Sequence, residues 1–272
     1  MTGFLLKKTF FDMWDNLYGI IILNLGFYIV FAATFGMSYL TIIGLSVFIP
    51  QDNIFGGFSA MMIIMIFVHC FYNVYAGAVS GVTKDIAYYQ PPTFAAFFQY
   101  LKETWKTSLG YGLLQGVISG IFVNAALFYL NNMNDQLNAI IFFIIVEVYV
   151  IWLIASQYFL TIQSNFDKKV PKNLKKMFLL LLDNTAFTIF GLTLISILFF
   201  TISVFTFFLV PGFVTILLLQ SVALKLRMYK YEYLEANPEA NRKKIPWETL
   251  LLEEKDKVGK RTFKGMIFPW KD

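Results

Sequence analysis

Residues 184–224 read NTAFTIFGLTLISILFFTISVFTFFLVPGFVTILLLQSVAL and contain no charged side chain. As one helix this stretch would extend about 60 Å, at about 1.5 Å per residue, whereas the hydrocarbon core of a membrane is about 30 Å thick. Pro211 and Gly212 near its centre predict a reversal, so we expect two spans joined by a hairpin near residues 200–212. Backbone amides in lipid must pair within their own segment, and the alternating pattern of a barrel strand is absent, so the spans should be helices.

The whole chain shows the same separation of apolar and charged residues. Of its 272 residues, 58% are hydrophobic and 14% are charged, compared with roughly a quarter charged in soluble domains. We therefore predict an all-α polytopic membrane protein with six transmembrane helices. The first apolar stretch is too long for one straight crossing. We expect a helix from Leu17 to about Thr34 with a tilted or kinked extension to Pro50, and seven spans is the alternative. The other apolar stretches lie at residues 58–83, 107–130 and 138–163.

The positions of the cations predict the orientation of the chain. All 22 Lys and Arg residues lie in the N-terminal segment, the second and fourth connections, or the C-terminal tail. The positive-inside rule then places both termini and these two connections in the cytoplasm. The net charge of +5 is explained by cationic rims that face anionic lipid headgroups, so we expect the lipid bilayer as a partner and no nucleic acid. The predicted domains are a six-helix transmembrane domain at residues 1–227 and a cytoplasmic tail at residues 228–272.

Three amphipathic segments predict an internal repeat. Residues 3–16, 93–106 and 172–182 precede the pairs of spans, and each places apolar side chains on one helical face. Helices of this kind lie in a membrane interface. The expected unit is therefore an interfacial helix followed by a helical hairpin, used three times. The clearest apolar stripe, with helical spacing, is Phe94, Phe97, Phe98, Leu101 and Trp105.

A polar pair lies at the end of each interfacial segment, where the chain is expected to turn into the membrane. Such side chains favour the N-cap of a helix, because they can accept hydrogen bonds from its first free amides. We therefore expect helix N-caps at three pairs: Asp15 and Asn16, Thr107 and Ser108, and Asp183 and Asn184.

Polar side chains within the spans are candidate site residues, because burying them in lipid is unfavourable. His69 and Glu147 are expected at matching depth near the middle of the membrane, on spans two and four. They form either a structural hydrogen bond or a pair that accepts and releases a proton. Five amides lie nearer the cytoplasmic side, where they either hydrogen-bond between helices or line a polar vestibule. These are Asn24, Asn73, Gln115, Gln157 and Gln220.

Small residues on two spans predict close helix packing. Gly112, Gly116 and Gly120 form a stripe on span three, and Gly77 with Gly81 repeats the spacing on span two. Glycine at this spacing lets two helix backbones approach closely. The pattern alone does not separate an internal contact from a dimer interface.

Signatures of catalysis are absent from the sequence. It contains no P-loop, HExxH, GxSxG or dinucleotide-binding motif, so we expect no enzyme, cofactor or metal site. In the tail, we expect the last span to continue as a helix to about Ala236 and a second helix to run from about Pro246 to Val258. The apolar residues 263–270 are expected either to fold back on the cytoplasmic rim or to bind a partner.

Three stretches resemble the YesL-like family of bacterial integral membrane proteins. They are WDNLYGIIILNLGFYIVFA at residues 14–32, AGAVSGVTKDIAYYQPPTFAAFFQYLKETWKTSLGYG at residues 76–112, and LLLLDNTAFTIFGLTL at residues 179–194. The resemblance extends to about Arg227 and implies a location in the bacterial cytoplasmic membrane. It also implies an accessory role beside a carbohydrate transporter, because members of the family are often associated with sugar uptake and glycan use.

Two hypotheses about function follow from these patterns. The first is a non-catalytic accessory or scaffold protein that binds membrane transporter subunits or forms a homo-oligomer. The second is a small channel or proton-coupled transporter that uses His69 and Glu147, since transporters are often built from internal repeats.

Overall fold

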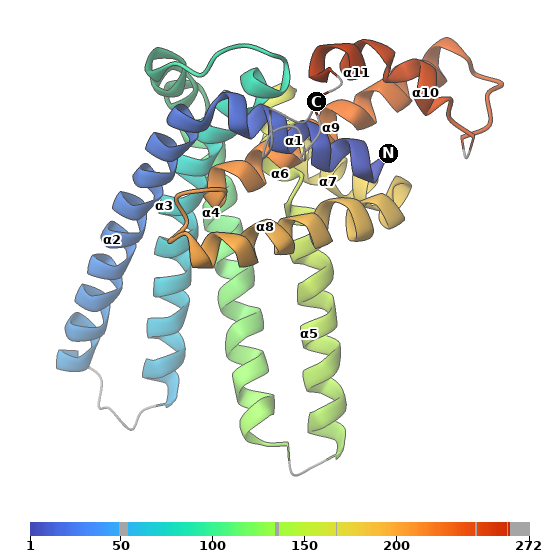
Figure 1. Cartoon of the computed structure of the whole chain (residues 1–272). Coiled ribbons are helices and arrows are strands. Elements are labelled where there is room, and N and C mark those ends of the chain that lie inside the picture. The colour runs from blue at the N-terminus through green and yellow to red at the C-terminus, as the bar shows by residue number, and fades with distance from the viewer. Residues whose placement is uncertain (49–53, 134–135, 167, 243, 260, 262–272) are drawn as a thin grey trace.

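The computed structural model describes residues 1–48, 54–133, 136–166, 168–242, 244–259 and 261. Every regular element in these ranges is a helix, as predicted (Figure 1). In chain order the helices are α1 (Thr2–Asp15), α2 (Leu17–Phe48), α3 (Ile54–Ala87), α4 (Phe94–Asn131), α5 (Gln136–Ser156), α6 (Phe159–Asn165), α7 (Val170–Asp183), the π-helix η1 (Phe187–Thr193), α8 (Leu194–Phe205), α9 (Gly212–Ala236), α10 (Trp247–Leu250) and α11 (Leu252–Val258).

Six helices in the described part of the chain are long and apolar enough to cross a membrane, which agrees with the predicted number. They are α2, α3, α4, α5 with α6, η1 with α8, and α9. The first is one continuous helix of 32 residues without a break at Gly36. Residues 49–53, where its extension was expected to end, and residues 262–272 of the apolar ending lie outside the described residues.

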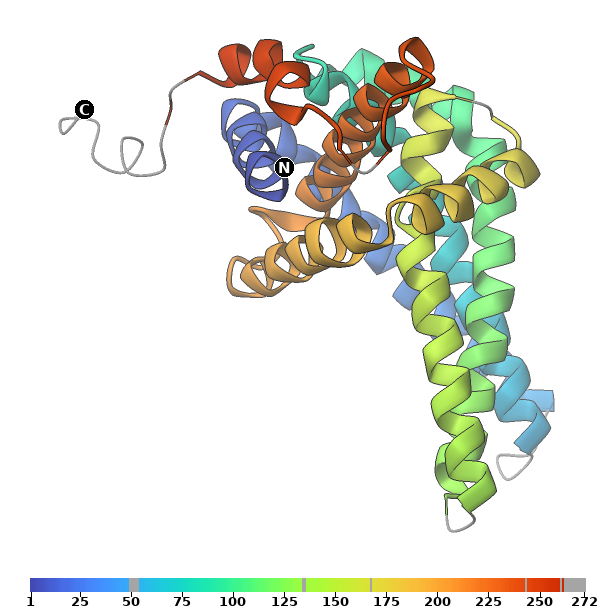
Figure 2. The same cartoon turned by 90° about the vertical axis from the view of Figure 1, so that its right-hand side faces the viewer.

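Two long helical hairpins define the shape of the molecule. α2 with α3, and α4 with α5, extend in the same direction, while α1, α10 and α11 gather at the opposite end (Figures 1 and 2). This opposite end is called the capped end below. The predicted interfacial helix at residues 3–16 corresponds to α1, and the one at residues 172–182 to α7.

The third pair of apolar helices does not repeat the first two. η1 and α8 lie across the long hairpins in both views, so the described helices do not form three equivalent units (Figures 1 and 2). Asn24, near the start of α2, explains this position. Its Nδ2 donates to the carbonyls of Leu209 and Pro211 at 2.9 and 3.1 Å, and its Oδ1 accepts from the Val214 amide at 3.0 Å. These bonds hold the α8–α9 turn beside the first turns of α2, whereas α2 and α4 run from there to the far end of the molecule (Figure 1).

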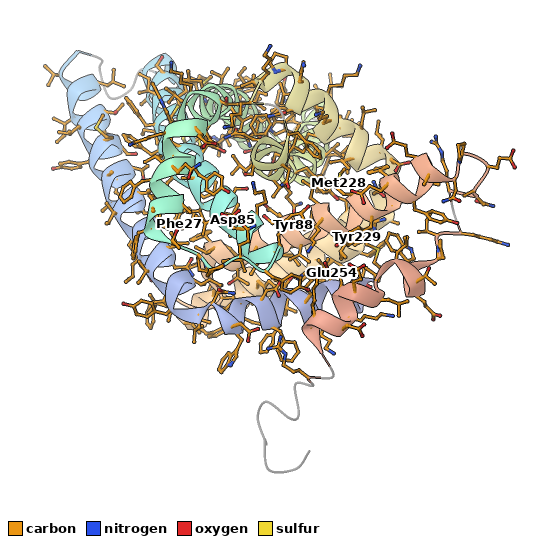
Figure 3. The ribbon with its side chains drawn as sticks, turned by 90° about the horizontal axis from the view of Figure 1, so that it is seen from above. Phe27, Asp85, Tyr88, Met228, Tyr229 and Glu254 are labelled. Carbon is orange, nitrogen blue, oxygen red and sulfur yellow. The ribbon has the colours of Figure 1, made fainter. Side chains whose placement is uncertain are left out.

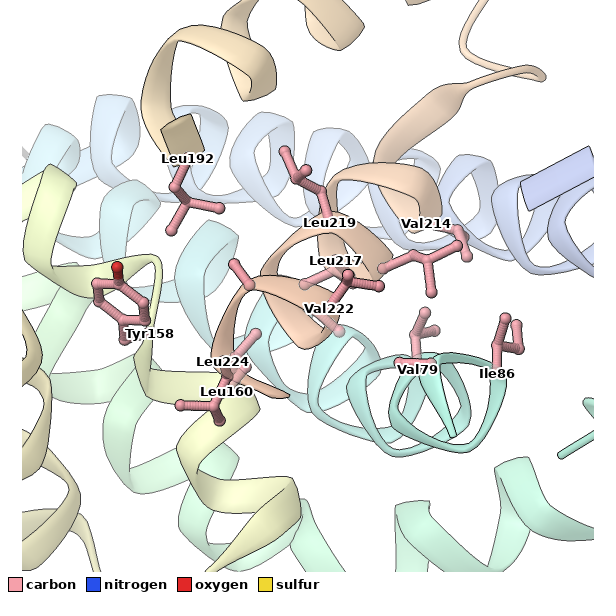
Figure 4. Packing of buried hydrophobic residues seen from close by; sticks show 14 of the residues in the cluster. Val79, Ile86, Tyr158, Leu160, Leu192, Val214, Leu217, Leu219, Val222 and Leu224 are labelled. Carbon is pink, nitrogen blue, oxygen red and sulfur yellow. The ribbon is translucent and has the colours of Figure 1, made fainter. Parts of the chain in front are cut away.

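α9 occupies the centre of the core. Its side chains pack between Val79 and Ile86 of α3, Leu160 of α6 and Leu192 of η1, all within one buried cluster (Figure 4). By contrast, Ala155 is the one buried residue of α5. In lipid, helices are held together by close packing rather than by the exclusion of water. Since α9 lies at the centre of this packing, it joins the hairpins to the capped end.

The second polar pair does not mark the start of a helix, so the N-cap prediction is wrong there. α4 runs unbroken through Thr107 and Ser108, and its N-cap is Thr93. Thr107 Oγ1 donates to a carbonyl between α6 and α7 at 2.7 Å, and Ser108 Oγ accepts from Gln163 at 2.7 Å. Residues 94–109 contain no Pro or Gly, so nothing interrupts the helix, and the two hydroxyls bond to neighbouring segments instead of to its own amides.

The first and third polar pairs end one helix and do not cap the next. Asn16 and Asn184 are the C-cap residues of α1 and α7. Each side-chain amide donates to the carbonyl four residues earlier, at 2.8 and 3.2 Å. The expected turns are present, but the side chains satisfy free carbonyls of the preceding helix. The neighbouring aspartates bind cations: Asp15 pairs with Arg261 and Asp183 with Lys230.

The glycine stripe of α4 packs against the backbone of α3. A Cβ atom at Gly116 would lie 2.5 Å from the Ile66 Cα, and one at Gly112 would lie 2.8 Å from the Cys70 Cα. Any side chain at these positions would therefore push the two helices apart. The stripe makes an internal contact between α3 and α4.

We predict that Gly116→Ala destabilises the protein, because the added methyl group cannot fit without separating α3 from α4. Overpacking of this kind typically costs about 1–3 kcal/mol. Gly44→Ala is the control, since nothing lies within 4 Å of a Cβ at Gly44. It should be neutral or slightly stabilising, because helical Gly is less favourable than Ala. Thermal unfolding in detergent measures both variants, and equal effects would contradict the internal contact.

Candidate functional site

A cavity of about 280 Å³ lies between α2, α3, α4, α9 and the junction of α5 with α6. Four of the five amides singled out in the sequence line this space together with His69. The fifth, Asn24, holds the α8–α9 turn as described above. Four hydroxyl side chains that sequence reasoning missed, on Thr34, Tyr72, Tyr111 and Ser156, add to the polar wall. The complete set of lining polar residues also includes Asn73, Gln115, Gln157 and Gln220.

Hydrogen bonds fix several of these side chains in place. Gln115 Oε1 accepts from the Trp152 indole at 2.8 Å, and Asn73 Nδ2 donates to the His69 carbonyl at 2.8 Å. Gln157 lies at the break between α5 and α6. Its Nε2 donates to Thr193 Oγ1 of η1 at 2.9 Å. The wall is therefore pre-organised on four helices, as a binding site requires.

His69 is held by an oriented chain of hydrogen bonds. Its Nδ1 lies 2.8 Å from the Met65 carbonyl, which can only accept, so Nδ1 carries the proton. Nε2, at 3.2 Å from Ser119 Oγ, is then the acceptor, and Ser119 Oγ accepts in turn from the Tyr149 hydroxyl at 3.0 Å. Every member of this chain is satisfied with a neutral imidazole. The arrangement therefore favours a structural role for His69 in the wall of the cavity.

The expected pairing of His69 with Glu147 is wrong. Glu147 is exposed on α5, and Tyr149, two residues later, makes the contact toward His69. Residues two apart in a helix point in nearly opposite directions, so the Glu147 carboxyl faces away from the cavity. Counting residues along the sequence places His69 and Glu147 at the same depth in the membrane. In the structure, however, Glu147 lies on the side of α5 that faces away from His69.

Two polar groups of the cavity have unused hydrogen-bonding capacity. Tyr111 is 2% exposed, and its buried hydroxyl lies beside the Ser156 hydroxyl but makes no hydrogen bond of standard geometry among the described residues. The Gln220 amide, on a residue that is 8% exposed, makes no side-chain hydrogen bond within the described part of the chain. Buried polar groups are normally paired. These two groups, from α4 and α9, therefore mark the part of the wall where a bound molecule would make its contacts.

The cavity adjoins a second hollow on the outside of the helices. This outer groove, of about 420 Å³, lies between α5, η1, α8 and α9. Leu153, Gln157 and Gln220 line both spaces. A molecule that reaches the cavity from this side would therefore pass the Gln157 side chain and its bond to Thr193.

A buried ion cluster lies at the capped end, about the carboxylate of Glu254 (Figure 3). Lys225 Nζ is 2.7 Å from Glu254 Oε1, and Lys8 Nζ is 3.3 Å from Oε2 and 2.9 Å from Asp12 Oδ2. These four side chains are at most 5% exposed. Tyr89 also donates its hydroxyl to Glu254 at 2.7 Å. The cluster joins α1, α9 and α11 with the chain that follows α3.

Sequence reasoning missed this cluster. The i, i+4 spacing of Lys8 and Asp12 is a visible signal, but the polar face of an amphipathic helix normally faces water. In the structure α11 covers that face, and its Glu254 lies 246 residues beyond Lys8. The predicted end of the last span at Ala236 is confirmed, whereas the second tail helix, expected as one element, is divided at Leu251 into α10 and α11.

The two carboxyls of the cluster have opposite pKa shifts. Burial raises the pKa of Asp12 to about 6, although Lys8 opposes the shift. Burial acts in the same direction on Glu254, but hydrogen bonds from Lys225 and Tyr89 and the charge of Lys8 outweigh it and hold its pKa at about 2. Glu254 is therefore the permanent anion of the cluster, and Asp12 is the group that titrates near neutral pH.

No known protein family, curated protein or solved structure matches the chain. The six apolar helices suggest a multi-pass membrane protein. Among the described residues, no group of three His, Cys, Asp or Glu side chains could hold a metal ion.

We predict that Glu254→Ala strongly destabilises the protein. It would leave Lys225 buried without its anion and Lys8 with Asp12 alone, and breaking a buried ion pair from one side costs about 3–5 kcal/mol. Glu253→Ala is the matched control, because the Glu253 side chain is exposed on the same helix. The midpoint of unfolding in detergent should fall for Glu254→Ala only; a similar loss in both variants would contradict the role of the cluster.

The stability of the protein should pass through a maximum near pH 4–5. As pH rises from about 4 to about 6, folded Asp12 retains a proton that the unfolded chain releases, so stability falls. As pH drops from about 4.5 toward 2, Glu254 takes up a proton in the unfolded chain at a higher pH than in the folded protein, so stability falls again.

The Asp12→Asn variant tests this profile, because it should lose less stability than the native protein as pH rises from 4 to 6. That loss is of the order of 2 kcal/mol in the native sequence. Asp256→Asn, an exposed carboxylate of α11, is the control. Melting temperatures measured across pH 3–8 would contradict the assignment if both variants kept the native profile.

Proposed function

We propose that this chain is a non-catalytic protein of the bacterial cytoplasmic membrane that binds a small, uncharged, hydroxyl-rich molecule in its central cavity. The observation that carries the proposal is a cavity lined by amides and hydroxyls in which the Gln220 amide and the buried Tyr111 hydroxyl keep hydrogen-bonding capacity that the described residues do not use. In the orientation that the cation distribution favours, the capped end and both termini face the cytoplasm.

The lining indicates the class of ligand. The described residues that line the cavity include no Lys, Arg, Asp or Glu, so no fixed charge is available to pair with an ionic solute. Amides and hydroxyls can both donate and accept hydrogen bonds, which suits a solute with several hydroxyl groups. A volume of about 280 Å³ is at the small end for ligand sites, which favours a solute no larger than a monosaccharide.

The accessory role implied by the YesL-like resemblance agrees with this ligand class. A sugar-binding cavity in a non-catalytic membrane protein would let the chain act beside a carbohydrate transporter, with that transporter's subunits as its partners. The well-packed capped end, where α11 is held by the buried ion cluster, would give such a partner a rigid surface.

A transporter is the second candidate, and the outer groove favours it. Gln157 and Gln220 line both the cavity and the groove, which gives a solute a route between them. Proton coupling through His69 and Glu147 has no support, because Glu147 lies on the side of α5 that faces away from His69. Uptake of labelled sugar by proteoliposomes that contain the purified protein alone would favour the transporter over the accessory protein.

We predict that neutral monosaccharides stabilise the purified protein in nanodiscs, whereas sugar phosphates do not. Gln220→Leu and Tyr111→Phe should each weaken binding by about tenfold, the effect of losing one buried hydrogen bond. Gln99→Leu, on the exposed part of α4, is the control and should bind like the native protein. Calorimetric titration and thermal shift measure this, and absence of binding across a panel of sugars and polyols would overturn the proposal.

A further inference from the structure

The η1–α8 segment has one face against the protein and an opposite face that is apolar and exposed. Its buried face belongs to the core and consists of Thr188, Leu192, Phe199 and Ser203. The exposed face, called the α8 stripe below, has the helical spacing i, i+4, i+7, i+11, i+15 and consists of Phe190, Leu194, Ile197, Thr201 and Phe205. Its end residues, Phe190 and Phe205, are 67% and 81% exposed. Apolar surface of this extent marks a contact with lipid or protein.

Both ends of α8 are held at nearly the same level along the long hairpins. Next to its start, Thr193 accepts a hydrogen bond from Gln157, which is 21 residues along the chain from Gln136 at the far end of α5. After its end, the α8–α9 turn is bound by Asn24, which is 24 residues from Phe48 at the far end of α2. At about 1.5 Å per residue, these levels are about 32 and 36 Å from the far end. Since α8 is about 18 Å long, it runs across the hairpins and not along them.

This level coincides with the boundary of the membrane. The hydrocarbon core is about 30 Å thick, so hairpins that begin at the far surface leave the core close to α8. Residues 17–83 and 107–167 contain no Lys or Arg. The first cation along α4 from the far end is Lys106, about 38 Å from Asn131, and the adjacent Trp105 is 43% exposed. Lys and Trp near the end of a span typically lie at the headgroups. α8 therefore lies where acyl chains meet headgroups.

We propose that the η1–α8 segment does not cross the membrane but lies in its plane, with the α8 stripe in the acyl chains of the leaflet next to the capped end. In Figure 2, α1 lies on one side of α8, and the hairpins extend beyond its other side. Ile197 of the stripe and Leu153 of α5 line the same outer groove, so the stripe is continuous with the apolar surface of the hairpins. The lipid that covers the hairpins therefore covers the stripe as well.

α9 leads from this turn toward the capped end and away from the far end. Lys225 Nζ donates to the carbonyl of Ala87, the last residue of α3, at 2.8 Å. That carbonyl is about 50 Å from the start of α3 at the far end. Among the described helices, the four that cross the membrane are therefore α2, α3, α4 and α5 with α6. Four crossings, like six, place both termini on one side, so this arrangement agrees with the distribution of cations and does not depend on the proposed ligand.

The depth of spin labels in liposomes of a neutral phospholipid tests the arrangement. In a Cys70→Ser background, nitroxides at Leu194→Cys and Phe205→Cys should differ in depth by about 4 Å, the difference between the two levels that hold α8. If η1–α8 crossed the membrane, the two depths would differ by about 17 Å, and that result would overturn the proposal. The matched control is the pair Ile140→Cys and Ile151→Cys, which has the same spacing on the exposed face of α5. These two labels should differ by about 17 Å.

The same labels identify what covers the stripe. Collisions with oxygen, which dissolves in the acyl chains, should be frequent at Leu194→Cys and Phe205→Cys, and collisions with a water-soluble nickel complex should be rare. Frequent nickel collisions at both positions would show that the stripe faces water. Immobilised labels that neither reagent reaches would show that a second copy or another protein covers it. Either result would exclude lipid as the occupant.

Discussion

The backbone contact between α3 and α4 sets the positions of most other elements. Where Gly112 and Gly116 face α3, the nearest atoms are backbone atoms of that helix, and the Gly112 position lies against the carbonyl of His69. The contact therefore fixes His69 and Asn73 on one helix relative to Tyr111 and Gln115 on the other. α9 then packs against α3 and closes the cavity. A larger residue in the stripe would change the shape of this polar wall as well as the stability of the fold.

The apolar spans could be predicted because each depends on its own segment: an uncharged run long enough to cross a membrane must satisfy its amides internally. The polar pairs were harder to interpret, since Thr107 and Asn184 bond to segments far along the chain. The depth of a residue in the membrane can be counted from the sequence. His69 and Glu147 were predicted to pair because this count places them at the same depth. Their separation depends on the rotation of α5 about its axis, which its contact through Tyr149 with Ser119 determines.

The polar residues of the spans divide into two groups with different surroundings. The amides and hydroxyls around the cavity line one space, and Gln115 and Gln157 bond to other helices, so they hold an uncharged polar space inside the bundle. Glu147 faces outward from a helix with almost no buried surface. A chain of mostly apolar helices retains such groups at a cost in lipid, and Glu147 lies apart from the polar space that the other groups surround.

The buried ion cluster has a consequence for the order of assembly. α1 and α9 each bring a lysine to the capped end, and the carboxylate that neutralises both comes from α11, late in the chain. During synthesis, the spans can enter the membrane while these two ammonium groups still face water. The capped end can close only after residue 254 has left the ribosome. A chain interrupted before that point would carry a complete set of spans and an open inner surface on which Lys225 lacks its carboxylate and Lys8 keeps only Asp12, which distinguishes it chemically from a finished molecule.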